Sequence, residues 1–157
     1  MDRDEKFKKE LEPRIEWLRK EEKYIEAFFF LSVALEKELT KLIELYEMHH
    51  ARLAKNNKRR LNLQNYRKTR YRVMMLGQLK DYLAIFIGEG NLIRELDYFI
   101  KLRNDCVHRI LDHSVTSLDD EVKKNLNRYY RLIYWLYRRQ IKLLSSANKS
   151  LARKAKI

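Results

Sequence analysis

Three polar side chains that lie close together in the sequence could act on an anionic substrate. Arg103, Asn104 and His108 fall within six residues of one another. A guanidinium keeps its positive charge and offers a planar fork of N–H donors, which suits oxyanions. An imidazole can accept or donate a proton near neutral pH. Asp112 follows His108 by four residues, one helical turn, and could hold the imidazole in one tautomer.

Arg103 lies where an apolar residue is expected. On an ideal helix with about 100° per residue, it falls near the middle of an apolar face. The row that contains it reads Leu96, Ile100, Arg103, Val107 and Ile110. A charged group in a core-facing row costs several kcal/mol unless it is paired or reached by solvent. Two interpretations follow: a buried ion pair, for example with Glu36 or Glu44, or a cleft or subunit interface that binds an anion.

These residues resemble the Arg-x4–6-His signature of HEPN-domain ribonucleases. Arg103 and His108 match its two fixed positions, and Asn104 matches the polar residue that follows the arginine. The stretches Val33–Leu39 and Met75–Leu79 are also similar to HEPN helix patterns. The resemblance covers roughly residues 24 to 144.

The resemblance implies cleavage of RNA without a metal ion or another cofactor. His108 would deprotonate a ribose 2′-hydroxyl, Arg103 would stabilise phosphoryl charge, and Asn104 would orient the phosphate or the arginine. It further implies a toxin or antiviral-defence ribonuclease that acts as a homodimer, and a nucleotidyltransferase-type antitoxin as a possible partner.

The spacing of the motif favours a shared active site. Arg103 and His108 are about 140° apart on an ideal helix, so one straight helix does not present them side by side. Either the helix is distorted, or two copies pool their motifs about a twofold axis. We expect the second arrangement, a homodimer with a composite site.

Helical periodicity without turn residues predicts an all-α fold. The chain has only three Gly and one Pro, and apolar residues recur at helical spacing. We predict one long helix from Pro13 to about Lys55, with a possible short helix before it over Asp4–Leu11. Further helices are expected from about 65 to 87, from 92 to 112, and from a Ser117 cap to about Ser146. Together they predict a single HEPN-like domain over residues 1–157, an antiparallel four-helix bundle whose basic tail frays from about residue 147.

Positive charge is concentrated after residue 50. Residues 1–50 carry 10 basic and 13 acidic side chains, whereas residues 51–157 carry 25 basic and 9 acidic ones. Such a distribution favours a polyanion, most simply nucleic acid, although a solubilising surface or an acidic partner protein would also fit. The candidate RNA contacts are Lys58, Arg59, Arg60, Arg67, Arg70, Arg131 and Arg138, while Tyr129, Ile133 and Leu136 of the same terminal segment are expected in the core.

The sequence gives less information about other candidate sites and about the cellular location. Cys106 is the single cysteine, so no disulfide within the chain is possible, and it reads as an ordinary core residue. His49 and His50 cannot share one helix face, and no metal site is expected. No apolar run reaches the ~20 residues that span a bilayer, so we expect a cytoplasmic protein. Two alternatives to the enzyme remain open: a silent helical module that binds RNA or an acidic partner, and an interaction protein in which Arg103 is a structural ion pair.

Overall fold

The computed structural model describes residues 7–56, 75–109 and 115–154. Within these ranges every regular element is a helix, and there is no strand. A short π-helical turn, η1, is followed by five α-helices: η1 Phe7–Leu11, α2 Glu12–Lys20, α3 Tyr24–Asn56, α4 Leu76–Ile87, α5 Asn91–Arg109 and α6 Val115–Lys154. The predicted all-α class is therefore confirmed.

The first long helix is interrupted, contrary to our prediction. The chain turns between α2 and α3, where Glu22 has a positive φ of 57°. The backbone amide of Lys23 donates to the carbonyl of Leu18 across this turn, at 2.9 Å. The side chain of Asp119 on α6 accepts a hydrogen bond from the amide of Ile25, at 3.0 Å, and so caps the start of α3. The turn folds α2 back along α3 and buries Leu18.

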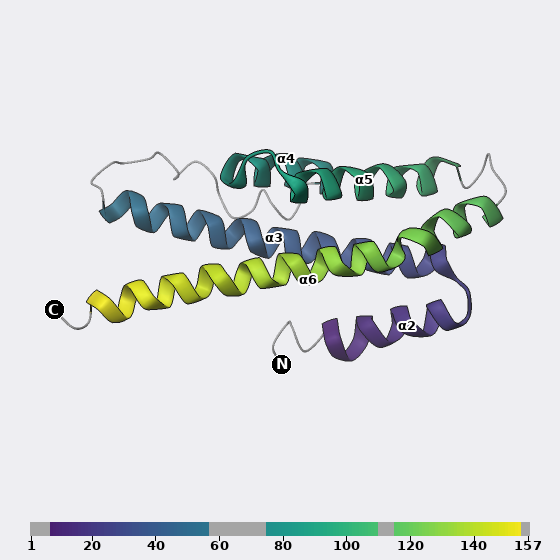
Figure 1. Cartoon of the computed structure of the whole chain (residues 1–157), viewed down its shortest axis with the longest axis horizontal. Coiled ribbons are helices and arrows are strands. Elements are labelled where there is room, and N and C mark those ends of the chain that lie inside the picture. Colours follow the sequence, from purple (N-terminus) through teal and green to yellow (C-terminus); the bar gives the residue numbers. More distant parts are fainter. Residues whose placement is uncertain (1–6, 57–74, 110–114, 155–157) are drawn as a thin grey trace.

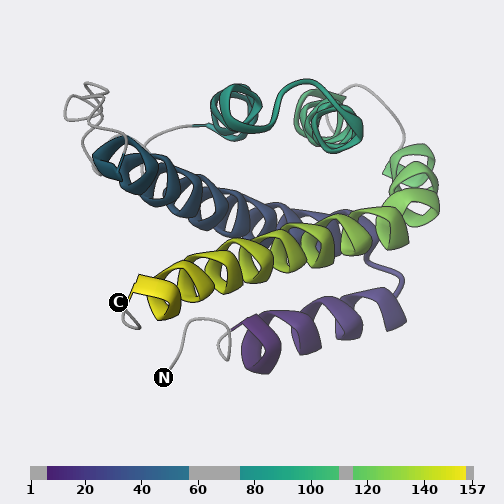
Figure 2. The ribbon, with the colours of Figure 1, turned by 60° about the vertical axis from the view of Figure 1, so that its left-hand side comes forward.

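The two longest helices, α3 and α6, lie side by side and run in the same direction (Figure 1). Phe28 packs against Tyr129, and Glu38 further along α3 bonds to Gln140 further along α6. Helix α5 runs the opposite way to α6. An antiparallel four-helix bundle is thus not confirmed, because the largest helix–helix interface is parallel. Figures 1 and 2 show α4 and α5 on one side of the α3–α6 pair and α2 on the other.

One continuous core joins all five α-helices. At its centre three rings from α3, α5 and α6 contact one another: Phe28–Phe99 at 4.8 Å, Phe28–Tyr129 at 5.5 Å and Phe99–Tyr129 at 4.7 Å between ring centroids. Ile133 and Leu136 of α6 are buried as well. The three core positions that we predicted in the last helix, Tyr129, Ile133 and Leu136, are therefore confirmed.

Several helix ends differ from the predicted ones. Met75 has an extended backbone and α4 begins at Leu76, so no helix continues across Met75, and residues 65–74 lie outside the described ranges. Helix α4 ends at Gly88, whose φ of 69° is the left-handed conformation that glycine permits. Helix α6 already includes Val115, so Ser117 is inside the helix and is not its cap, and the helix continues past Ser146 to Lys154.

Candidate functional site

The motif residues lie on the last two turns of α5. Arg103 is half-buried, and Asn104 and His108 are exposed. Asp112, the expected partner of His108, lies outside the described residues. Helix α4 leaves this end of α5 uncovered: Lys80 bonds to Asp97 across the antiparallel α4–α5 pair, so the first residue of α4 is level with about residue 101. Figure 1 shows α5 extending past α4.

The buried side of α5 narrows toward its end. The buried residues are Leu92, Ile93, Leu96, Phe99, Leu102 and Cys106, and on a helical projection Arg103 falls near the middle of these positions, as we predicted. Between residues 102 and 108, however, only Leu102 and Cys106 are buried, and Arg103 lies beside them and is half-buried. Val107, one turn after Arg103 and expected in the core, is 45% exposed. The apolar row that includes Arg103 thus begins in the core at Leu96 and ends in solvent at Val107.

Arg103 has no charge partner in the part of the chain that the structure describes. No hydrogen bond or ion pair there involves its guanidinium, and the pair with Glu36 or Glu44 that we considered is not formed. Solvent reaches the half-buried guanidinium, which removes most of the free-energy cost of leaving its charge unpaired. The guanidinium is consequently available to an external anion.

The regular course of α5 keeps Arg103 and His108 apart. The helix continues without interruption to Arg109, so the distortion that would bring the two side chains together is not observed. An α-helix separates positions five residues apart by about 140°. Asn104 lies between them, adjacent to Arg103 in sequence and one turn before His108. A single protomer therefore presents the pair on different sides of one helix.

Carboxylates surround the nearby Cys106. Burial first, and then Glu121, Asp105 and Asp119, raise the pKa of the Cys106 thiol to about 11. A fully buried, protonated thiol is a core residue, as we expected, and a poor nucleophile. The same carboxylates oppose the binding of an anion at this end of α5.

The predicted RNA contacts are only partly within the described residues. Arg131 and Arg138 are exposed on α6. The other five, Lys58, Arg59, Arg60, Arg67 and Arg70, lie outside the described ranges. Sequence reasoning missed Lys124 and Lys142, which are exposed on the same side of α6 as Arg131 and Arg138. A helical projection of the terminal segment was sufficient to find them, because the successive positions 124, 131, 138 and 142 are seven, seven and four residues apart.

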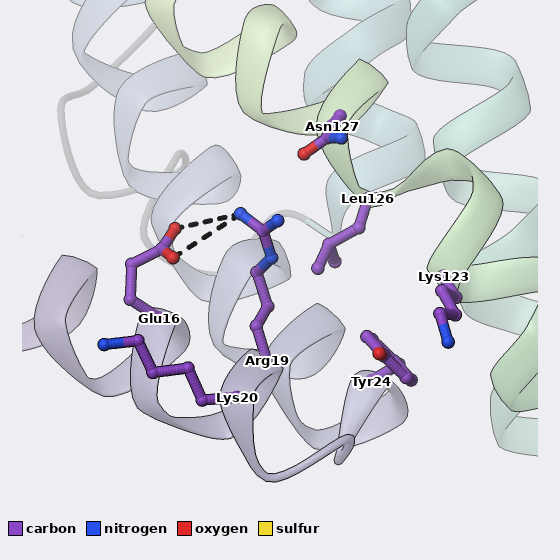
Figure 3. Close-up of a pocket in the computed structure, with 7 residues that line it drawn as sticks. All are labelled: Glu16, Arg19, Lys20, Tyr24, Lys123, Leu126 and Asn127. Carbon is purple, nitrogen blue, oxygen red and sulfur yellow. Dashed lines mark hydrogen bonds and ion pairs between the residues drawn. The ribbon is translucent and has the colours of Figure 1, made fainter.

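A pocket of about 460 Å³ lies between α2, the start of α3 and α6 (Figure 3). Its lining consists of Glu16, Arg19, Lys20, Tyr24, Lys123, Leu126 and Asn127. Two of its cations already have neighbours: Arg19 bonds to Glu16 at 3.1 Å, and the Lys123 ammonium lies 4.9 Å from the centre of the Tyr24 ring. The pocket is on the α2 side of α6, whereas the motif is on α5.

The described residues contain no group of three His, Cys, Asp or Glu side chains that could hold a metal ion. His50 packs against Phe86 of α4, with 5.3 Å between ring centroids. No helix within the described ranges has both the length and the apolar character needed to cross a membrane. No family model, curated protein or solved structure matches this chain. The candidate site therefore has to be judged from its own geometry.

Proposed function

We propose that this protein is a metal-independent endoribonuclease of the HEPN type, with Arg103, Asn104 and His108 as catalytic residues. The observation that carries the proposal is the state of Arg103: half-buried among apolar neighbours, yet without an ion pair within the described residues. Solvent reaches this cation, and no described side chain pairs with it, so an anionic substrate can do so. Asn104 and His108 are exposed on the same end of α5 and reachable by a substrate.

The reaction follows from the chemistry of the three side chains. A neutral His108 imidazole takes the proton of a ribose 2′-hydroxyl, and the oxygen attacks the adjacent phosphorus. The bond to the 5′-oxygen breaks and that oxygen takes a proton from water, which leaves a 2′,3′-cyclic phosphate and a 5′-hydroxyl end, while the His108 imidazolium returns its proton to solvent. Arg103 stabilises the charge that grows on the phosphoryl oxygens, and Asn104 orients the phosphate. DNA lacks the 2′-hydroxyl and is not a substrate.

Two copies share the active site in this proposal. The regular α5 helix separates Arg103 from His108, so one protomer does not present both side chains to the same phosphate. Val107 offers an exposed apolar contact, 45% accessible, between them on the same uncovered end of α5. A twofold axis near this end places the Arg103 of one protomer opposite the His108 of its partner. A HEPN-like bundle, a toxin or defence role in the cytoplasm and a nucleotidyltransferase-type antitoxin belong to the same proposal.

The test of catalysis compares variants on total RNA in excess chelator. Wild type cleaves RNA, His108→Ala lowers the rate by about 10²–10⁴-fold, and Arg103→Ala lowers it by about 10²–10³-fold. Arg94→Ala is the matched control, because Arg94 is an exposed arginine on the same helix whose side chain bonds only to the exposed Asn91. Equal cleavage by wild type and His108→Ala refutes the assignment.

A mixing experiment tests the shared site. Arg103→Ala and His108→Ala are each inactive, but a mixed dimer contains one site with an intact arginine from one copy and an intact histidine from the other. Statistical mixing restores about a quarter of the wild-type activity, since half of the dimers are mixed and each has one of two sites intact. If the mixture stays inactive under conditions in which subunits exchange, the shared site is refuted, and Arg103 and His108 act within one protomer.

A second candidate function is favoured by the exposed cations of α6. A helical module without catalysis would bind RNA in a salt-sensitive manner, and its binding would survive Arg103→Ala and His108→Ala. Cleavage that depends on His108 excludes this alternative. Binding without any cleavage by wild type supports it.

A further inference from the structure

One side of α6 carries a row of exposed cations with an indole among them. Lys124, Arg131, Trp135, Arg138 and Lys142 are all exposed and fall within about 60° of one another around the helix. We call these five residues the α6 cationic face. They span 18 residue steps, or about 27 Å of a continuous helix. Helix α6, which carries this face, runs along the long axis of the molecule (Figure 1).

Asp120, one turn before Lys124, is on the same side of α6, and the cations of this face beyond Lys124 have no acidic neighbour on their own helix. The sequence from Val122 to Lys154 contains no Asp or Glu. Arg128 lies beside the face but does not belong to it. Its charge is neutralised by Glu95 of α5, to which it donates two hydrogen bonds at 2.5 and 2.8 Å. None of the four cations of the face has an ion pair or a hydrogen bond within the described residues. Their summed potential attracts a polyanion.

Trp135 gives this face a feature that a merely solvated row of charges lacks. Its side chain is 44% exposed although it is large and apolar. The Arg139 guanidinium lies 5.9 Å from the centre of its ring, and Arg139 is itself fixed by a hydrogen bond from its Nε to the Tyr46 hydroxyl, at 2.7 Å. Exposed aromatic rings between cations are the arrangement that binds unpaired bases by stacking. A duplex keeps its base faces covered and cannot use such a ring.

We propose that the α6 cationic face is a docking surface for single-stranded RNA. The phosphates lie along Lys124, Arg131, Arg138 and Lys142, and one unpaired base stacks on Trp135. The choice of RNA over DNA rests on the proposed ribonuclease function, whereas the single-stranded form rests on Trp135. The surface is separate from Arg103 and His108, so binding and cleavage can be measured independently.

The test uses the full chain with His108→Ala, in chelator, and a short unstructured fluorescent RNA. Affinity is measured by anisotropy over a range of salt concentrations. Each phosphate contact with a single strand contributes a slope of about −0.7 in log K against log salt. Replacing the four cations with alanine therefore makes the slope shallower by about 3. Trp135→Ala weakens binding by between about fivefold and a hundredfold and leaves the slope unchanged.

A matched variant controls for loss of net charge. Arg14→Ala, Lys20→Ala, Lys37→Ala and Arg94→Ala remove four exposed cations from α2, α3 and α5. Alanine preserves helices at all eight positions, and unchanged circular dichroism verifies the fold. An equal change of slope in the control overturns the proposal. So does an absence of RNA binding by the parent chain, or Trp135→Ala that binds RNA as well as the parent.

Competitors decide the identity of the ligand. The single-stranded RNA binds more tightly than the same RNA in a duplex, than a DNA strand of the same sequence, and than an acidic polypeptide of equal charge. Equal or tighter binding by any of these competitors overturns the corresponding part of the proposal. If binding follows the α6 cationic face while wild type cleaves nothing, the docking surface stands and the proposed catalysis fails.

Discussion

Replacing Gln140 by leucine is expected to destabilise the fold by an amount that the α3–α6 interface determines. Gln140 is 6% exposed and Glu38, its partner on α3, is 7% exposed. The Gln140 amide donates to the Glu38 carboxylate at 2.9 Å and to the Glu38 carbonyl at 3.0 Å. Loss of a charged and a neutral hydrogen bond, with the acceptors left buried, costs about 2–4 kcal/mol.

This loss is large enough to measure by thermal unfolding. For a chain of this length each kcal/mol lowers Tm by about 2–4 °C, so Gln140→Leu lowers it by about 5–15 °C. Circular dichroism records the transition, and urea unfolding gives the free energy directly. Lys41 remains as a partner of Glu38, at 2.9 Å, and keeps the loss below that of a fully isolated carboxylate.

A double variant provides the control for this reasoning. Replacing both Glu38 and Gln140 by leucine removes the buried carboxylate together with the amide donor, and the remaining Lys41 is accessible to solvent. The carbonyl of residue 38 remains inside helix α3. The double variant is therefore more stable than Gln140→Leu alone. If Gln140→Leu unfolds at the wild-type temperature, or if the double variant is the less stable of the two, the paired amide and carboxylate do not stabilise this interface.

Three further predictions concern single side chains. Hydrogen bonds from Arg128 lower the pKa of Glu95, so the pair stabilises the fold above the ordinary pKa of 4.5 and this contribution is lost as pH falls through the lowered value. Because both side chains are partly exposed, Glu95→Gln lowers the free energy of unfolding by about 0.5–1 kcal/mol at neutral pH. In acid, the free energies of unfolding of the variant and of wild type converge. A difference that stays the same at all pH values contradicts the assignment. Cys106 is fully buried and burial raises its pKa to about 11, so iodoacetamide labels it only at the rate of unfolding; rapid labelling of the native protein excludes this burial. The Tyr130 hydroxyl is buried without a hydrogen-bond partner in the described residues, and burial first, followed by the nearby Glu16 carboxylate, raises its pKa. Tyr130→Phe therefore leaves Tm unchanged or raises it, and a drop of several degrees reveals a bond to Glu16.

The fold class followed from composition and periodicity, but the direction of the helices did not. Few glycines and prolines and a helical apolar repeat were sufficient to predict an all-α chain. The reversal at Glu22 has no sequence signal, since Glu21, Glu22 and Lys23 are ordinary helix formers. It is stabilised from a distance, by Asp119 of α6 and by the burial of Leu18. Such tertiary contacts override local preference and are invisible to a reading of local sequence.

The same reason explains the errors at Val107 and Leu102. A helical projection ranks residues by type and therefore counted Val107 as core and left out Leu102. The structure exposes the first and buries the second, because neighbouring helices determine which apolar residues of α5 are covered. Within the described residues Arg103 has no ion pair and His108 is exposed. The residue types of the site were readable from sequence, but their accessibility was not.

The parallel contact between α3 and α6 has a consequence for the order of folding. The Glu38–Gln140 bond joins residues 102 positions apart in the chain. At a translation rate of about 5–20 residues per second, α3 waits roughly 5–20 s for this partner. During that interval α2 can cover part of α3, but Leu39 and Leu42 lack the α6 side of their core. The nascent chain thus exposes an apolar face of α3 until α6 is synthesised. The risk of aggregation is therefore greatest before α6 leaves the ribosome.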